Sequence, residues 1–72
     1  MSKGITVYGT PTCSACKELE ADLGRRGIKY TYIDVSQVPI DGITTVPTMD
    51  IFDGEMQRIT GYTPKRIKEL FG

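Results

Sequence analysis

Cys13 and Cys16 are the two residues of this 72-residue chain whose types and spacing point most directly to chemistry. Thiols at this spacing can form a redox couple, contribute half of a metal site, or simply pack as small buried side chains. A zinc or iron–sulfur site needs about four ligands, and the chain contains no histidine. Metal binding would therefore require a second copy of the chain or an external thiol, which favours redox chemistry.

The residues around the cysteines change from a strand pattern to a helix pattern at Cys13. Residues 5–9 (ITVYG) are β-branched and aromatic and end in glycine, which predicts a strand. From residue 14 to residue 26 the apolar side chains recur at helical spacing, and Asp22 falls outside their stripe. The stripe consists of Ala15, Cys16, Leu19 and Leu23. Cys13 should thus begin a helix, where free backbone N–H groups and the helix dipole favour a thiolate.

Such a placement would give the two sulfurs unequal roles in thiol–disulfide exchange. The thiolate of Cys13 would attack a substrate disulfide and form a mixed disulfide with it. Cys16, one turn into the helix and sheltered on the apolar stripe, would then attack Cys13 and release the reduced substrate.

A second predicted strand, residues 29–34 (KYTYID), follows the helix and completes a strand–helix–strand unit with parallel strands. A C-x-x-C pair inside such a unit is typical of thioredoxin-like redox proteins. The interval 35–47 has no convincing period and contains Pro39 and Gly42, so it should hold at most a single helical turn.

The remaining residues predict a hairpin and a final helix. Residues 48–52 and 55–59 alternate as strands, and the Asp-Gly step between them predicts a type I′ turn. The last helix should begin at Pro64, with Thr63 as its N-cap. Its apolar face consists of Ile67, Leu70 and Phe71.

Alternation along the strands indicates that one face of the sheet is only partly covered. Thr6, Thr31 and Asp50 fall on the side of their strands that lies opposite the main apolar positions. A sheet buried on both faces would instead show nearly continuous apolar runs. Two helices can cover one face, so we expect both to pack on the same side.

Composition limits the kinds of partner. Nine basic and nine acidic residues cancel, so we expect no binding to nucleic acid or to an anionic membrane. No apolar run approaches the ~20 residues of a membrane span, and the start of the chain lacks a signal-peptide pattern. We therefore expect a single domain over residues 1–72 that acts as a cytoplasmic monomer.

Three segments together resemble the glutaredoxin family, and in particular its small NrdH-type redoxins. They are residues 5–16 (ITVYGTPTCSAC), 45–49 (TVPTM) and 61–70 (GYTPKRIKEL). The resemblance implies thiol–disulfide oxidoreductase activity, a cis bond before Pro47, and an α/β class minimal thioredoxin fold with a four-stranded mixed sheet in the order β-α-β-β-β-α. The interval 35–45 is too short for the family's middle helix, which should be reduced or absent.

The resemblance also assigns a substrate groove around the cysteines. Its expected residues are Thr10, Pro11, Thr12, Thr45, Val46, Pro47, Gly61, Tyr62 and Thr63. A cis Pro47 would leave the backbone of Val46 free to pair with an extended substrate, as in strand addition. The expected partners are a disulfide-containing protein, with ribonucleotide reductase as one candidate, and the reductant that restores the thiols.

Three departures from the family pattern bear on that reductant. Thr10 stands where most glutaredoxins have a lysine that binds a glutathione carboxylate. Ser14 and Ala15 replace the common Pro-Tyr pair, and Thr63 or Pro64 stands where an acidic residue commonly binds the glutathione amino group. We expect no bound cofactor and either glutathione or a thioredoxin reductase with NADPH as reductant. The departures weigh against specific recognition of glutathione.

Three alternatives stay open at this point. The first is a glutathione-dependent glutaredoxin proper. The second is a dimer that shares zinc or an iron–sulfur cluster through Cys13 and Cys16. The third is an interaction domain that docks on a partner through the half-covered face of the sheet.

Overall fold

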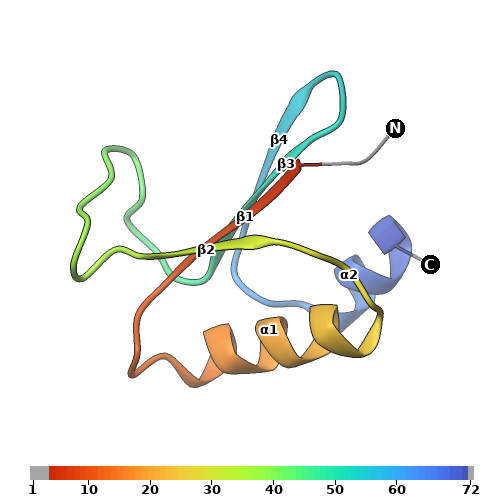
Figure 1. Ribbon diagram of the computed structural model, residues 1–72, viewed down its shortest axis with the longest axis horizontal. Helices are drawn as coiled ribbons and strands as arrows, with labels where there is room; N and C mark the ends of the chain where they lie inside the picture. The colour runs from red at the N-terminus through yellow and green to blue at the C-terminus, as the bar shows by residue number, and fades with distance from the viewer. Residues whose placement is uncertain (1–3, 72) are drawn as a thin grey trace.

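The computed structural model describes residues 4–71 and shows the predicted order of elements (Figure 1). They are β1 (Gly4–Gly9), α1 (Ser14–Arg25), β2 (Thr31–Asp34), β3 (Thr48–Phe52), β4 (Met56–Thr60) and α2 (Pro64–Phe71). The strands form one sheet in the order β2-β1-β3-β4, in which β1 and β2 are parallel and the other neighbours are antiparallel. The predicted mixed four-stranded fold is confirmed, although β2 begins two residues later than expected, at Thr31.

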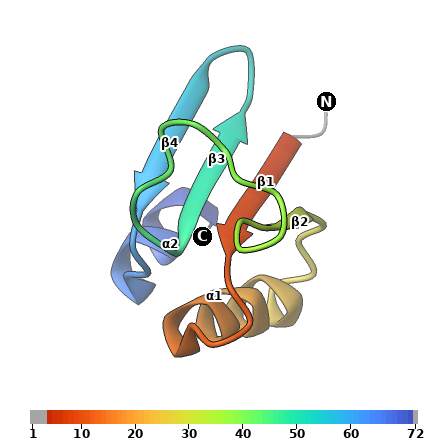
Figure 2. The ribbon, with the colours of Figure 1, turned by 90° about the vertical axis from the view of Figure 1, so that its left-hand side faces the viewer.

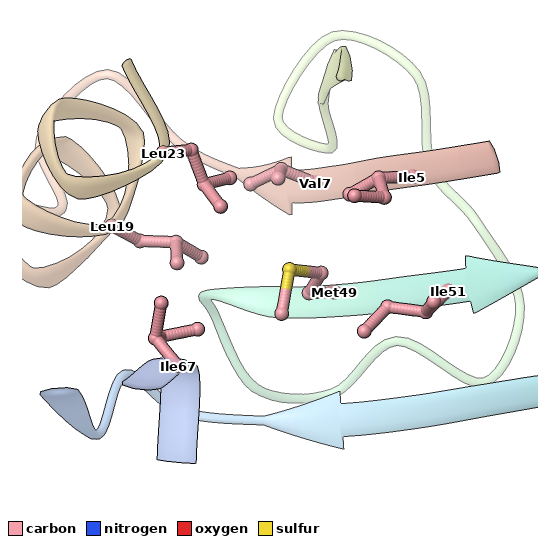
Figure 3. Close-up of a cluster of buried hydrophobic side chains, with 7 residues drawn as sticks. All are labelled: Ile5, Val7, Leu19, Leu23, Met49, Ile51 and Ile67. Atoms are coloured by element: carbon pink, nitrogen blue, oxygen red, sulfur yellow. The ribbon is translucent and has the colours of Figure 1, made fainter. Parts of the chain in front are cut away.

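Both helices pack against the same face of the sheet, as strand alternation predicts (Figure 1). Alternate side chains of β1 and β3 point to that face. Ile5 pairs with Ile51 and Val7 pairs with Met49, so the two strands contribute their apolar side chains to the same face. The buried core between the sheet and the helices consists of Ile5, Val7, Leu19, Leu23, Met49, Ile51 and Ile67 (Figure 3). Leu70 and Phe71 are partly buried against it, as the predicted apolar face of the last helix requires.

The helices begin at the predicted residues. α1 starts directly after Cys13, and α2 starts at Pro64. The carbonyl of Thr63 accepts a hydrogen bond of 3.1 Å from the N–H of Ile67, which places Thr63 at the N-cap. α1 has 12 residues and α2 has 8. Within residues 4–71, no helix has the length and apolar character needed to cross a membrane.

The turn between β3 and β4 is not the type I′ turn that the Asp-Gly step predicts. Phe52 pairs with Met56, so the connection contains one residue more than the predicted two-residue turn. A type I′ turn needs positive φ at both central residues. Gly54 has a φ of 81°, but among residues 4–71 only glycines have positive φ, which excludes Asp53. The prediction was wrong because β4 begins one residue later than its sequence pattern indicates.

The face of the sheet away from the helices carries polar side chains beside the exposed Phe52 and Met56, and the segment 35–47 covers part of it (Figure 2). Arg58 and Asp50 pair across β4 and β3 on this face, with Nε–Oδ1 and Nη2–Oδ2 distances of 2.7 and 2.9 Å. These bonds hold the pKa of Asp50 below its ordinary value. The segment crosses in front of β3 and β4 in Figure 2, and a Cβ on Gly42 would lie 3.5 Å from Arg58 Nη1. It forms turns and no helix, so the family's middle helix is absent, as expected.

Candidate active site

Cys13 occupies the N-cap position of α1, as predicted. Its backbone is extended, with φ −88° and ψ 108°, and its Sγ atom accepts a hydrogen bond of 3.1 Å from the N–H of Cys16. The N–H of Cys13 donates to the carbonyl of Thr10 at 3.3 Å and closes the turn between β1 and α1. The residue is partly exposed. Its sulfur thus lies beside an N–H donor at the positive end of the helix dipole, surroundings that stabilise negative charge on sulfur.

Cys16 is fully buried and packs against the end of β1. A Cβ on Gly9 would lie 2.8 Å from the Cys16 Sγ atom and 3.2 Å from the ring of Tyr32. Any larger side chain at Gly9 would therefore displace the sulfur. The sequence pattern indicates Gly9 only as the end of a strand and does not predict that it makes space for the Cys16 sulfur. The available signal was a glycine placed shortly before the first cysteine.

Burial also separates the chemistry of the two thiols. It raises the pKa of the Cys16 thiol to about 11, and a hydrogen bond with the Cys13 sulfur acts in the same direction. Cys16 therefore keeps its proton at neutral pH. One sulfur is accessible at a helix N-terminus, while the other is sheltered and protonated, and this difference is what the predicted roles in thiol–disulfide exchange require.

Among the described residues, the two thiols are the metal donors that the site offers. Within residues 4–71, no group of three or more His, Cys, Asp or Glu side chains is arranged to hold a metal ion. A metal bound by the pair would need further ligands from outside the described residues.

The peptide bond between Val46 and Pro47 is cis, as the family resemblance implies. Pro47 is buried, and its carbonyl accepts a hydrogen bond of 2.7 Å from the N–H of Gly61. This bond ties the segment before β3 to the segment after β4. The half-buried Val46 forms no backbone hydrogen bond with any residue from 4 to 71.

Sheet topology brings the predicted groove residues to one end of the molecule. β1 ends at Gly9, β3 begins at Thr48 and β4 ends at Thr60, and β3 is antiparallel to both of the others. These three ends are therefore neighbours. The segments next to them contain Thr10, Pro11 and Thr12, then Thr45, Val46 and Pro47, then Gly61, Tyr62 and Thr63. Contact between these residues and a substrate stays a prediction.

Tyr62 links the segment before α2 to a buried carboxylate on α1. Its hydroxyl donates a hydrogen bond of 2.9 Å to Asp22, which also accepts one of 3.0 Å from Arg26 Nε. Burial alone would raise the pKa of Asp22, but the bonds from Tyr62 and Arg26 outweigh it and hold that pKa below its ordinary value. This contact anchors one wall of the predicted groove to the helix that carries the cysteines.

Asp22 also corrects an interpretation of the sequence. The sequence pattern places Asp22 off the apolar stripe, whereas its side chain is only 7% exposed. A helical wheel places it about 60° from Leu19, at the border of the stripe. Its partner Tyr62 lies 40 residues further along the chain, and only the fold brings the two together.

Known proteins share this fold. A sequence model of the family described as Glutaredoxin matches residues 5–63. NrdH-redoxin from Escherichia coli superposes with a TM-score of 0.75 at 24% identity, over 94% of this chain and 95% of that chain. A glutaredoxin from Archaeoglobus fulgidus gives a TM-score of 0.74 at 24% identity, over 92% and 83%. Mitochondrial thioredoxin 3 from Saccharomyces cerevisiae gives 0.72 at 18% identity, over 97% and 76%. The search of curated proteins found no match.

The bond between Tyr62 and Asp22 predicts a stability effect. Tyr62→Phe should lower the free energy of unfolding by about 1.5–3 kcal/mol, because it removes a hydrogen bond to a buried charged group. Urea unfolding at pH 7 measures the change. The effect should be present above the ordinary Asp22 pKa of 3.8 and shrink as the pH falls through the lower folded value, where the carboxylate takes up a proton.

Tyr32→Phe is the matched control for this measurement. The Tyr32 hydroxyl has no hydrogen-bond partner within the described part of the chain, so its removal should cost less than about 0.5 kcal/mol. Equal losses for the two substitutions would contradict the importance of the bond between Tyr62 and Asp22.

The raised pKa of Cys16 predicts a dependence of stability on alkaline pH. An unfolded thiol ionises near 9.0, whereas the folded Cys16 thiol ionises near 11. Between these values the folded state holds a proton that the unfolded state has lost, so the free energy of unfolding of the reduced protein should fall as the pH rises. Chemical unfolding of wild type and Cys16→Ala, both reduced, between pH 8 and 11 isolates the contribution of this thiol. Parallel curves for the two proteins would refute the assignment.

Proposed function

Because the chain belongs to the glutaredoxin family of thiol–disulfide oxidoreductases, we propose that it reduces disulfides of protein substrates through Cys13 and Cys16. The observation that carries this proposal is the inequality of the two thiols. Cys13 is partly exposed at the N-cap of α1, and Cys16 is buried with a raised pKa. An attacking sulfur must meet the substrate, and a resolving sulfur must wait until the mixed disulfide has formed.

The first step is the attack of the Cys13 thiolate on one sulfur of the substrate disulfide. The bond between Cys13 and the substrate forms as the substrate's own S–S bond breaks, and the departing thiolate takes up a proton. Negative charge on Cys13 before the attack is stabilised by the N–H of Cys16, which lies 3.1 Å from the sulfur.

The second step is the attack of Cys16 on the Cys13 sulfur. Cys16 first gives up its proton to the solvent, and its sulfur then forms the disulfide with Cys13. The bond between Cys13 and the substrate breaks, and the second substrate sulfur leaves as a thiolate that takes up a proton. The protein has lost two electrons to the substrate and needs a reductant before the next cycle. The short helical spacing of the two cysteines supports this intramolecular step.

Substrate positioning is assigned to the segment around the cis proline. The backbone N–H and C=O of Val46 have no partner within the described residues and can pair with an extended segment of the substrate. The groove residues predicted from the sequence, on either side of Cys13 and Pro47, would flank such a segment. Ribonucleotide reductase is one substrate to test. We propose that the protein acts as a monomer and that the reaction takes place in the cytoplasm.

The proposed reductant is a thioredoxin reductase with NADPH. Thr10, Ser14 and Ala15 stand in place of residues that typically serve glutathione in the family. The NrdH-redoxin from Escherichia coli, whose fold this chain shares, is a glutaredoxin-like protein with a thioredoxin-like activity profile. Glutathione is the second candidate, favoured by the match to the glutaredoxin family itself.

Cysteine substitutions test the proposed mechanism. With insulin as the disulfide substrate, Cys13→Ser should reduce turnover to the level of the uncatalysed exchange, because no attacking sulfur remains. Cys16→Ser should accumulate a covalent mixed disulfide, which intact-mass spectrometry detects as an adduct on Cys13. Retained activity in Cys13→Ser would refute the mechanism. Equal turnover by Cys16→Ser and wild type would leave only a mechanism that uses Cys13 alone.

The source of electrons is tested by supplying one reducing system at a time. Oxidation of NADPH is followed with a thioredoxin reductase alone, and then with glutathione and glutathione reductase. We expect turnover of the protein with the first system to exceed turnover with the second by about tenfold or more, equivalent to about 1.4 kcal/mol in the activation barrier. The reverse order would identify a glutathione-dependent glutaredoxin.

A further inference from the structure

A groove with basic side chains lies between β4 and α2, beside the end of the sheet that holds the proposed active site. Its volume is about 450 Å³, and its lining includes Arg58, Thr60, Thr63, Lys65, Arg66 and Glu69. β4 is an outermost strand of the sheet formed by the described residues, so the groove runs along an open edge.

Two of the three cations in the groove have no acidic partner. Arg58 is bound to Asp50 through its Nε and Nη2 atoms. Lys65 and Arg66 form no ion pair with any residue between 4 and 71. Glu69 is the acidic group of the lining and offsets part of their charge. The groove therefore carries a local excess of positive charge on a chain whose net charge is zero.

The groove adjoins the segment that should position the substrate. Thr60 lines it and pairs with Thr48, the residue after the cis proline. The next residue, Gly61, donates its N–H to the Pro47 carbonyl at 2.7 Å. A polypeptide that pairs with Val46 while its disulfide meets Cys13 would thus have neighbouring residues within reach of the groove.

We propose that this groove binds an acidic segment of the protein substrate, close in sequence to the disulfide that Cys13 attacks. The inference rests on the proposed function and adds a substrate class to it. Carboxylates on the substrate would pair with Lys65 and Arg66, and the hydroxyls of Thr60 and Thr63 would donate hydrogen bonds to the same segment. Charge complementarity of this kind favours the correct partner and speeds its association more than it raises affinity.

Two peptide disulfides of equal length test the proposal, one flanked by glutamates and one by glutamines. At low salt the wild type should reduce the glutamate peptide with a kcat/KM about tenfold higher, since two exposed ion pairs contribute an effect of this order. The advantage should shrink as salt screens the charges. The double substitution Lys65→Gln/Arg66→Gln should abolish the advantage and leave reduction of the glutamine peptide unchanged.

A matched control removes two positive charges outside the groove. Lys29→Gln/Lys68→Gln changes the net charge by the same amount, and Lys68 lies on the same helix but does not line the groove. This variant should keep the preference for the glutamate peptide. Equal loss of preference in the two double variants would overturn the proposal, because the net charge of the protein would then explain the effect.

Other outcomes reassign the groove or the protein. Equal kcat/KM of the wild type for the two peptides would overturn the proposal. If Lys65→Gln/Arg66→Gln lowered kcat/KM for a mixed disulfide of glutathione as much as for the glutamate peptide, the groove would be assigned to that tripeptide. If a single-stranded oligonucleotide inhibited the wild type competitively but did not inhibit this variant, the groove would be assigned to nucleic acid. Failure of the wild type to reduce either peptide would instead overturn the proposed function, and the inference with it.

Discussion

The burial of the Cys16 sulfur against Gly9 is the contact on which the rest of the active site depends. It places the first turn of α1 against the end of β1. Because the helix begins there, a backbone N–H meets the Cys13 sulfur, while the second sulfur is withdrawn from water. Two identical side chains acquire different chemistry from their surroundings alone. The absence of a side chain at Gly9 thus leaves the space in which one of the two sulfurs is buried.

The segments at this end of the sheet are held by polar contacts between loops and helix. The N–H of Gly61 binds the carbonyl of Pro47, and the next residue, Tyr62, binds Asp22 on α1. The segment 61–62 is therefore held by the residue before β3 on one side and by α1 on the other. Functional loops on a rigid scaffold commonly depend on such contacts. In a domain this small, where the core is limited, each of these hydrogen bonds represents a larger share of the stability.

The periodicity of apolar residues predicted most of the fold, and the local pattern around the cysteines predicted that α1 begins directly after Cys13. The helices, the strands and the common side of both helices followed from the spacing of apolar residues, which is a local property. The connection after Phe52 was mispredicted because its length depends on where β4 begins pairing. The contact of Tyr62 with Asp22 joins two distant segments, and the space beside Gly9 exists only after α1 has docked. Such contacts between distant segments leave at most a partial signal in the sequence. For Asp22 that signal is its position at the border of the apolar stripe.

The central position of β1 has a consequence for how the molecule assembles. β1 lies between β2, which follows shortly after it, and β3, which pairs Ile5 with Ile51 from the far part of the chain. Bringing such distant residues together costs loop entropy, and long-range pairing of this kind slows folding. The unit from β1 to β2 and the hairpin of β3 and β4 can each form from nearby residues. During synthesis on the ribosome, which proceeds from the N-terminus, we therefore expect both thiols to emerge before the second half of their pocket has been made.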